Sequence, residues 1–261
     1  EYIAKGWTRI DTIGTLAWSG VLRFLLSPYR RSLTRYDSAL AYALLGIVAG
    51  LVSGLAVIAF ERGIDELALL WGGGDGGGGF EALPGSLRSA IPVVGAVLLG
   101  LAFTLLRNED REVGIVHVIS RLHGNYGILP WRNAVVQFIG GVLSLASGQS
   151  GGREGPGVHL GGATSSLLGQ WLSLPNNSLR VLIACGTAGG IAAAFNTPLA
   201  GVIFAMEVIV SEYTVAGFMP VMLSSVVASA LSRQLGGGSE IFSLPGMDLH
   251  SLWEIPYILV L

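Results

Sequence analysis

The 261-residue chain is 51% hydrophobic and only 12% charged, whereas charged residues make up about a quarter of an ordinary soluble domain. This composition excludes an ordinary soluble protein and favours one embedded in a lipid bilayer. The formal net charge of −2 indicates no particular partner, and no basic patch interleaved with aromatic residues suggests a nucleic acid.

Residues 1–36 predict a cytoplasmic or interfacial helix. The amphipathic segment 10–26 ends at Ser27-Pro28 and places Trp7 and Trp18 at the depth of the lipid headgroups. Basic residues remain on the cytoplasmic side of a membrane, so the N-terminus is expected in the cytoplasm. Six of them precede the first apolar stretch: Lys5, Arg9, Arg23, Arg30, Arg31 and Arg35. We therefore expect an integral, multi-pass protein of the plasma (inner) membrane.

Three stretches without a charged residue are long enough to span the bilayer: residues 39–60, 89–106 and 181–206. The first crossing is expected to extend from about residue 38 to residue 70. Within it, Gly46, Gly50 and Gly54 recur at every fourth position. This pattern either opens one helix face to the close approach of another backbone or simply reflects the abundance of glycine.

Other segments predict shorter helices separated by breaks. Helices are expected at 111–122, at 134–147, from Pro156 to about Leu172 and at 215–231, the third because proline favours a first turn. Two breaks should interrupt the helices: the glycines of residues 148–152 and the sequence 195–198, which ends in proline. A flexible external loop is expected at 72–79, and 252–261 resemble the start of a further membrane helix, so the chain is expected to stop within an architecture.

Charge within the second half of the chain is concentrated at one loop. Between Asn133 and Met206 the charged residues are Arg153, Glu154 and Arg180. An ionisable group at membrane depth is costly and typically marks a transport pathway. The alternative is that Arg153 and Glu154 form a salt bridge that holds a loop.

A helix that starts at Pro156 would leave its first N–H groups unpaired, and these groups together with the helix dipole form an anion site. The Glu154 carboxylate could occupy that site as a tethered competitor of a free anion. A nearby anion raises the proton affinity of a carboxylate in a low dielectric, so Glu154 could also transfer protons.

Several other functions are excluded. A Walker loop requires GK[ST] after its glycines, and a dinucleotide fold requires a later acidic residue that 172–179 lack. We predict no enzymatic function, no cofactor and no metal site, since His117 and His123 lack cysteine or carboxylate partners at metal-ligand spacing. His159 is expected to pack with a hydrogen bond, with pH sensing near the pore as the alternative. The single cysteine, Cys185, is expected to pack as a small apolar residue.

Two sequence motifs indicate a family. The string GREGP occupies 152–156, and AAAFNTPLAGVIFAME occupies 192–207. Together they closely resemble the CLC family of chloride channels and chloride/proton antiporters, at that family's spacing. The resemblance covers most of the chain from about residue 38 onward.

The resemblance implies an all-α, polytopic homodimer in which each subunit has its own pore, built from two halves of opposite membrane orientation. It makes 37–235 the first membrane repeat and 236–261 a linker and the truncated start of the second. The helices of 199–231 would contribute to the dimer interface. Glu154 becomes the gating and external proton-transferring residue, and the amides of Gly152, Arg153, Glu154 and Gly155 would line the outer site for chloride or a similar small anion.

Two departures from the family are visible. Where the family usually has GSGIP, this chain has EVGIV at 112–116, and the Val113 side chain cannot donate a hydrogen bond. Backbone N–H groups of Val113, Gly114 and Ile115 remain candidate anion ligands. The inner proton-transfer glutamate of the exchangers is replaced by Val208, as in the channel branch, although Glu207 and Glu212 lie nearby.

Three functions follow in order of preference. The first is a passive or weakly coupled anion channel, and the second is a proton-coupled anion antiporter. The third is a non-conducting membrane scaffold, which Val113 and the missing second half favour and Glu154 disfavours.

Overall fold

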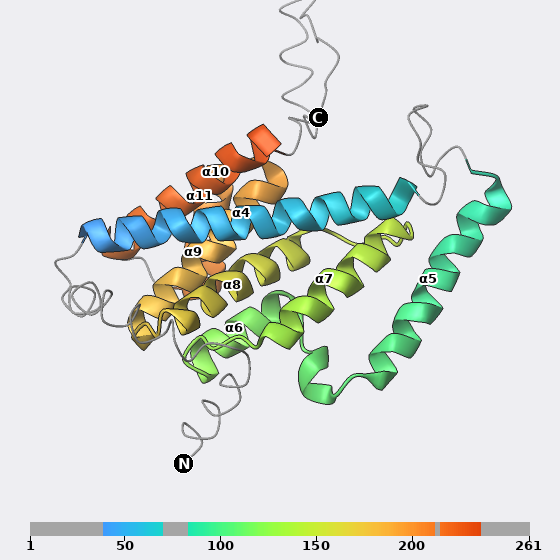
Figure 1. The fold of residues 1–261 in the computed structure, drawn as a ribbon, viewed down its shortest axis with the longest axis horizontal. Helices are drawn as coiled ribbons and strands as arrows, with labels where there is room; N and C mark the ends of the chain where they lie inside the picture. The colour runs from blue at the N-terminus through green and yellow to red at the C-terminus, as the bar shows by residue number, and fades with distance from the viewer. Residues whose placement is uncertain (1–38, 70–82, 212–214, 236–261) are drawn as a thin grey trace, which may run out of the picture.

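A computed structural model describes residues 39–69, 83–211 and 215–235, and within these ranges the chain is helical without a β-strand (Figure 1). This confirms the all-α prediction. The α-helices are α4 (Ala39–Leu69), α5 (Gly85–Leu105), α6 (Gly114–Gly124), α7 (Trp131–Ala146), α8 (Glu154–Trp171), α9 (Asn176–Phe195), α10 (Pro198–Phe204) and α11 (Val215–Leu235). A 3-10 helix, η3 (Asn108–Arg111), precedes α6, and a π-helix, η4 (Ala205–Val210), follows α10. The predicted elements at 1–36, 72–79 and 252–261 lie outside the described residues.

Most helix boundaries lie within a few residues of the expected ones, and two of the differences bear on the site. Helix α8 begins at Glu154 rather than at Pro156, so Pro156 still lies in the first turn, where a backbone N–H is not needed. Helix α6 begins at Gly114 rather than at 111, because residues 108–111 form η3 and Val113 is extended. Gly114 has φ +80°, a conformation that favours glycine.

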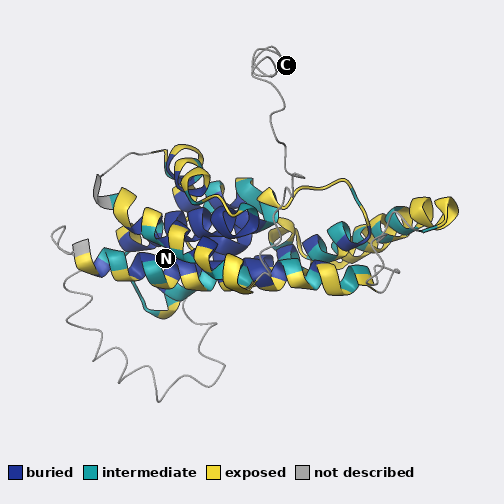
Figure 2. Ribbon diagram, turned by 90° about the horizontal axis from the view of Figure 1, so that it is seen from above, coloured by how far each residue is buried: buried dark blue, intermediate teal, exposed yellow. Residues whose placement is uncertain are grey.

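Among the residues that the structure describes, three helices are long and apolar enough to cross a bilayer: Leu40–Leu69, Gly85–Leu105 and Asn176–Phe195. Helix α5 lies at the edge of the helices in Figure 1, where it contacts α7, and it contains no buried residue. Its exposed side chains include Val93, Val97, Leu98 and Leu101, and much of it is drawn as exposed in Figure 2. An apolar helix that is exposed to this extent would be unfavourable in water and is compatible with lipid.

Helix α4 packs against α11 through the three regularly spaced glycines. A Cβ atom at Gly46 would meet the carbonyl oxygen of Pro220, and one at Gly50 would meet that of Ser224. At Gly54 it would lie 3.2 Å from Ala228 Cα. The prediction that this helix face permits close approach of another backbone is therefore confirmed.

Helices α8 and α9 form the buried centre of the described chain, as Figure 2 shows in dark blue. Gly161 on α8 faces the backbone of Gly186 and Gly190 on α9, so the two helices touch through their main chains. Cys185 is fully buried in an apolar cluster with residues of α4, α10 and α11, in agreement with the expected packing role. This tight pair fixes the position of the first turn of α8.

Candidate functional site

The loop before α8 begins with a well-defined end of α7. Gly148 adopts φ +77° and donates its N–H to Leu145 O, while Gln149 N–H bonds to Ser144 O. These two bonds form a Schellman motif, which ends a helix most readily at a glycine. The glycine break predicted here is present, and it leads into the exposed residues Gly151 to Glu154.

Glu154 is the first residue of α8, and no side chain caps this helix. The N–H groups of its first turn therefore remain available to an anion, with the positive end of the helix dipole behind them. The Glu154 carboxylate folds back over Gly152, since any Cβ atom at Gly152 would collide with it. Around Gly155 the space is open, with nothing within 4 Å of a built Cβ. Glycine at 152 thus leaves room for the Glu154 carboxylate, and the backbone at Gly155 is open to approach.

Arg153 does not pair with Glu154. Its Nη1 lies 3.4 Å from Glu61 Oε1 on α4. The alternative in which Arg153 and Glu154 form a loop-holding salt bridge is therefore wrong, because Glu61 offers the guanidinium a carboxylate from a neighbouring helix. The Glu154 carboxylate is left without that arginine.

A second helix N-terminus lies close to this loop. Helix α6 also has no side-chain cap, and its N-cap residue is Val113. The preceding turn is held by Asn133 of α7, whose Nδ2 donates to the carbonyl oxygens of Glu109 and Glu112, both at 2.8 Å. Asn133 thereby positions Val113 and Gly114 relative to α7.

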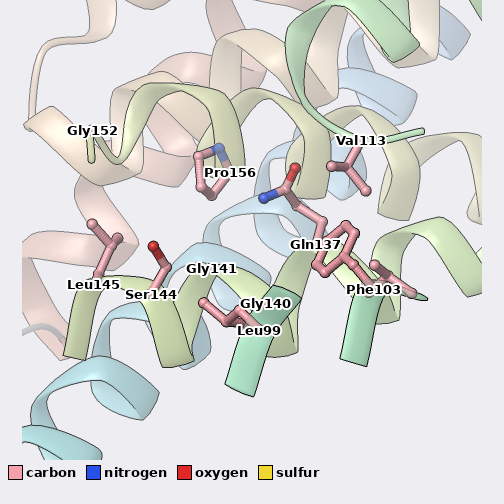
Figure 3. A pocket seen from close by; sticks show the side chains of 11 residues that line it. Leu99, Phe103, Val113, Gln137, Gly140, Gly141, Ser144, Leu145, Gly152 and Pro156 are labelled. Carbon is pink, nitrogen blue, oxygen red and sulfur yellow. The ribbon is translucent and has the colours of Figure 1, made fainter. Parts of the chain in front are cut away.

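One cavity of about 260 Å³ joins the two helix starts (Figure 3). Val113, Gly152 and Pro156 line it together, so two segments 39 residues apart in the sequence meet at one site. The other predicted anion-binding residues, Gly114, Ile115, Arg153, Glu154 and Gly155, adjoin these segments but do not line the cavity. The remaining lining residues are Leu99, Phe103, Val136, Gln137, Gly140, Gly141, Ser144 and Leu145.

Gln137 is a site residue that the sequence analysis missed. It lies on α7 with 8% of its surface exposed, and its Oε1 finds no hydrogen-bond partner in the described part of the chain. The available signal was a carboxamide within an otherwise apolar helical segment, which by itself does not show where the side chain points.

A buried histidine pair joins α6 to α8. His117 Nδ1 lies 2.9 Å from His159 Nε2, and the rings stack with centroids 5.2 Å apart. Arg121 Nε donates to His117 Nε2, so His117 must donate through Nδ1. His159 Nδ1 then carries a buried hydrogen for which the described residues supply no acceptor. The sequence indicated neither the contact nor its direction.

The position of the inner proton-transfer glutamate, Val208 in this chain, lies on the π-helix η4. Glu207 and Val208 are both exposed there, and Ile209 packs into the core with residues of α6, α8 and α9. Single π turns often occur at functional sites. Glu212 lies outside the described residues.

Comparison with known proteins identifies relatives for most of the chain. A family model described as "Voltage gated chloride channel" matches residues 94–261. A putative chloride channel protein ClcB-like from Ralstonia nicotianae is 33% identical over 219 residues, which are 82% of this chain and 51% of that protein. The H(+)/Cl(−) exchange transporter ClcA of Vibrio cholerae is 30% identical over 232 residues, 83% of this chain and 47% of the transporter.

Two solved structures share the fold. One is a slow cyanobacterial Cl−/H+ antiporter, with TM-score 0.60 and 26% identity over 83% of this chain and 52% of the antiporter. The other is a CLC-type fluoride/proton antiporter, with TM-score 0.66 and 26% identity over 87% of this chain and 54% of that protein. The chain spans about half the length of the curated relatives that it matches.

Proposed function

The chain belongs to the voltage-gated chloride channel family, the CLC family, and from this membership we propose that the full-length protein transports chloride or a similar small anion across a membrane with Glu154 as its gate. The observation that carries the proposal is the cavity where the start of α6 meets the start of α8. Two uncapped helix N-termini adjoin this cavity of about 260 Å³, and the partial positive charge at a helix N-terminus favours a negative charge nearby.

Glu154 is suited to act as the gate because its carboxylate is attached to the same turn whose N–H groups would hold the anion. In the present conformation it lies over Gly152, one of the residues that line the cavity. An ionised carboxylate in this position competes with a passing anion, and protonation removes the competing charge. Anion passage and the protonation state of Glu154 would therefore depend on each other.

Proton-coupled exchange is the second candidate. It is supported by the relatives that are named as exchange transporters and antiporters. Against tight coupling, Val208 replaces the inner proton-transferring glutamate that the family resemblance leads one to expect. The exposed carboxylate of Glu207, next to it on η4, could accept protons in its place.

The chemistry of the transported anion depends on Val113. The Val113 side chain presents methyl groups to the cavity where a hydroxyl donor would favour chloride. Fluoride, after which one structural neighbour is named, is thus an anion to test beside chloride.

The proposed assembly follows the family plan. Two copies would form a homodimer in the bilayer through helices within 199–231, each copy with its own pore. The N-terminus would lie in the cytoplasm, and the membrane would be the plasma (inner) membrane. Small inorganic anions and protons would be its ligands, without a nucleic-acid partner.

Anion efflux from liposomes that contain the full-length protein tests the proposal, with external pH recorded simultaneously. Wild type is compared with Glu154→Gln, which keeps the shape of the side chain but removes its charge. Glu109→Gln serves as the matched control, because Glu109 is an exposed carboxylate on η3 outside the cavity.

The outcomes separate the candidates. Efflux that drives proton movement, with loss of the proton flux alone in Glu154→Gln, supports exchange despite Val208. Efflux without a proton signal, together with a mutant changed only in rate or pH dependence, supports a channel. If neither protein passes anions, transport is refuted and a scaffold is the better description.

A further inference from the structure

The cavity between α6 and α8 has an unusual shortage of polar side chains. Six of its lining side chains are apolar, and three lining residues are glycines: Leu99, Phe103, Val113, Val136, Leu145 and Pro156, with Gly140, Gly141 and Gly152. Only Gln137 and Ser144 bring a polar side chain to its wall. Any side-chain ligand for a guest in this space must therefore come from one of these two residues.

Ser144 is already engaged. Its hydroxyl donates to Gln149 Oε1 at 3.0 Å, within the turn that ends α7. That hydrogen bond helps to hold the loop, and a hydroxyl has a single hydrogen to donate. Ser144 consequently has no hydrogen left for a guest in the cavity.

Gln137 is not engaged in this way. Its buried Oε1 has no hydrogen-bond partner among the described residues. With over nine-tenths of the residue buried, bulk water cannot compensate. Figure 3 shows the amide extending into the space between Val113 and Pro156. A buried polar group of this kind indicates a ligand that the protein alone does not supply.

We propose that the Gln137 side-chain amide is a direct ligand of the transported anion and sets its selectivity. The inference rests on the proposed transport function. The amide offers two N–H donors to the anion, and its oxygen accepts a hydrogen from a water molecule that the anion retains. Gln137 thus supplies the donor that Val113 lacks, from the neighbouring helix.

This arrangement suits a small, strongly hydrated anion such as chloride or fluoride. Such an anion loses more when it is stripped of water than a large, weakly hydrated anion such as thiocyanate. A donor for the ion and an acceptor for its last water reduce that cost mainly for the small anion. Removing the amide should therefore lower the preference for chloride over thiocyanate.

The test is the chloride/thiocyanate permeability ratio of the full-length protein in liposomes, for wild type, Gln137→Met and Gln137→Glu. Methionine fills the same volume without donors. The glutamate variant keeps the shape and the acceptors, lacks the amide donors and, when ionised, adds a negative charge that repels both anions. We expect the ratio to fall about tenfold or more in both variants, since a hydrogen bond to a charged group is lost. Gln234→Met is the matched control, because Gln234 is an exposed residue of α11 outside the cavity, and its ratio should stay at the wild-type value.

Gel filtration of each variant checks the fold, and Gln137→Glu alone decides if the methionine variant does not fold. Folded variants that conduct with the wild-type ratio overturn the role of Gln137 and leave the transport function standing. An equal change in Gln234→Met also overturns it, because the change would then not depend on an amide in the cavity. Absence of anion flux in wild type refutes the transport function itself, and with it any ligand role in transport.

Discussion

Replacing Gly161 with alanine should separate the two central helices. Gly161 lies in the middle of α8, where a Cβ atom would meet the carbonyl oxygen of Gly186. The same atom would lie 3.0 Å from Gly186 C and 3.1 Å from Gly190 Cα. Ordinary carbon–carbon contacts lie at about 3.5–4.0 Å. Because all three neighbours are backbone atoms of α9, no side-chain rotation can relieve the overlap.

The size of the effect follows from two opposing contributions. Alanine is favoured over glycine within a helix by about 1 kcal/mol. Overpacking typically costs about 1–3 kcal/mol, and a collision with rigid backbone should fall at the upper end. Gly157→Ala isolates the steric part, because a Cβ atom there would lie 3.5 Å from Gly190 O, an ordinary contact. We expect Gly161→Ala to be less stable than Gly157→Ala by about 2–3 kcal/mol.

The assay is unfolding of the full-length protein in detergent, with the two variants measured under the same conditions. Anion efflux should fall in Gly161→Ala as well, since α9 supports the helix whose first turn carries Glu154. Equal unfolding midpoints for the two variants would refute the claim that backbone contact joins α8 and α9. A stability loss without any change in efflux would refute only the link to the site.

Further substitutions test the cap, the histidine pair and the loop contact. Asn196 ends α9 with φ +55° and accepts from Ser229 Oγ at 2.8 Å, so Asn196→Ala should be less stable than Asn196→Gly by about 1 kcal/mol in denaturant unfolding. His117→Phe should lower the free energy of unfolding by about 1–3 kcal/mol, because it leaves His159 Nε2 buried and unpaired. Adding His159→Phe should recover part of this loss. Additive losses in a double-mutant cycle would contradict the pairing. Arg153→Gln should change stability by less than about 1 kcal/mol, because its pair with Glu61 is partly exposed, and a larger change in the thermal midpoint would contradict a surface pair.

Much of the helical framework could be predicted because the bilayer imposes simple rules on sequence. The crossing expected near residues 38–70 is α4 at Ala39–Leu69, since the charge-free stretch 39–60 within it is stable only as a helix in lipid. The glycine breaks also appeared as expected, as at Gly148, where a positive φ is required. The spacing of Gly46 and Gly50 predicted a close backbone contact but not that α11 would supply it. Local patterns thus gave the elements, and the pairing of the elements came only from the structure.

The site was predictable where chemistry is local and was missed where it depends on tertiary contacts. Glu154 stood out because a carboxylate amid apolar residues is costly wherever it points. Gln137 is neutral, and its meaning depends on facing a cavity whose other walls come from α5, α6 and α8. The pair of His117 and His159 likewise requires two helices 42 positions apart in sequence to come together. Neither the direction of the Gln137 side chain nor the contact between the two histidines can be inferred from one sequence without its fold.

The interpretation of Val113 shows how a local departure changes meaning in three dimensions. Considered along the sequence, valine at this position removes a hydroxyl donor and leaves the anion site weaker. In the folded chain, α7 places the Gln137 amide at the wall of the same cavity, and Asn133 on the same helix holds the turn that carries Val113. Helix α7 therefore positions both Val113, which lacks a donor, and the Gln137 amide, which can replace that donor. It follows that selectivity in this protein should respond to changes on α7 as strongly as to changes at residue 113.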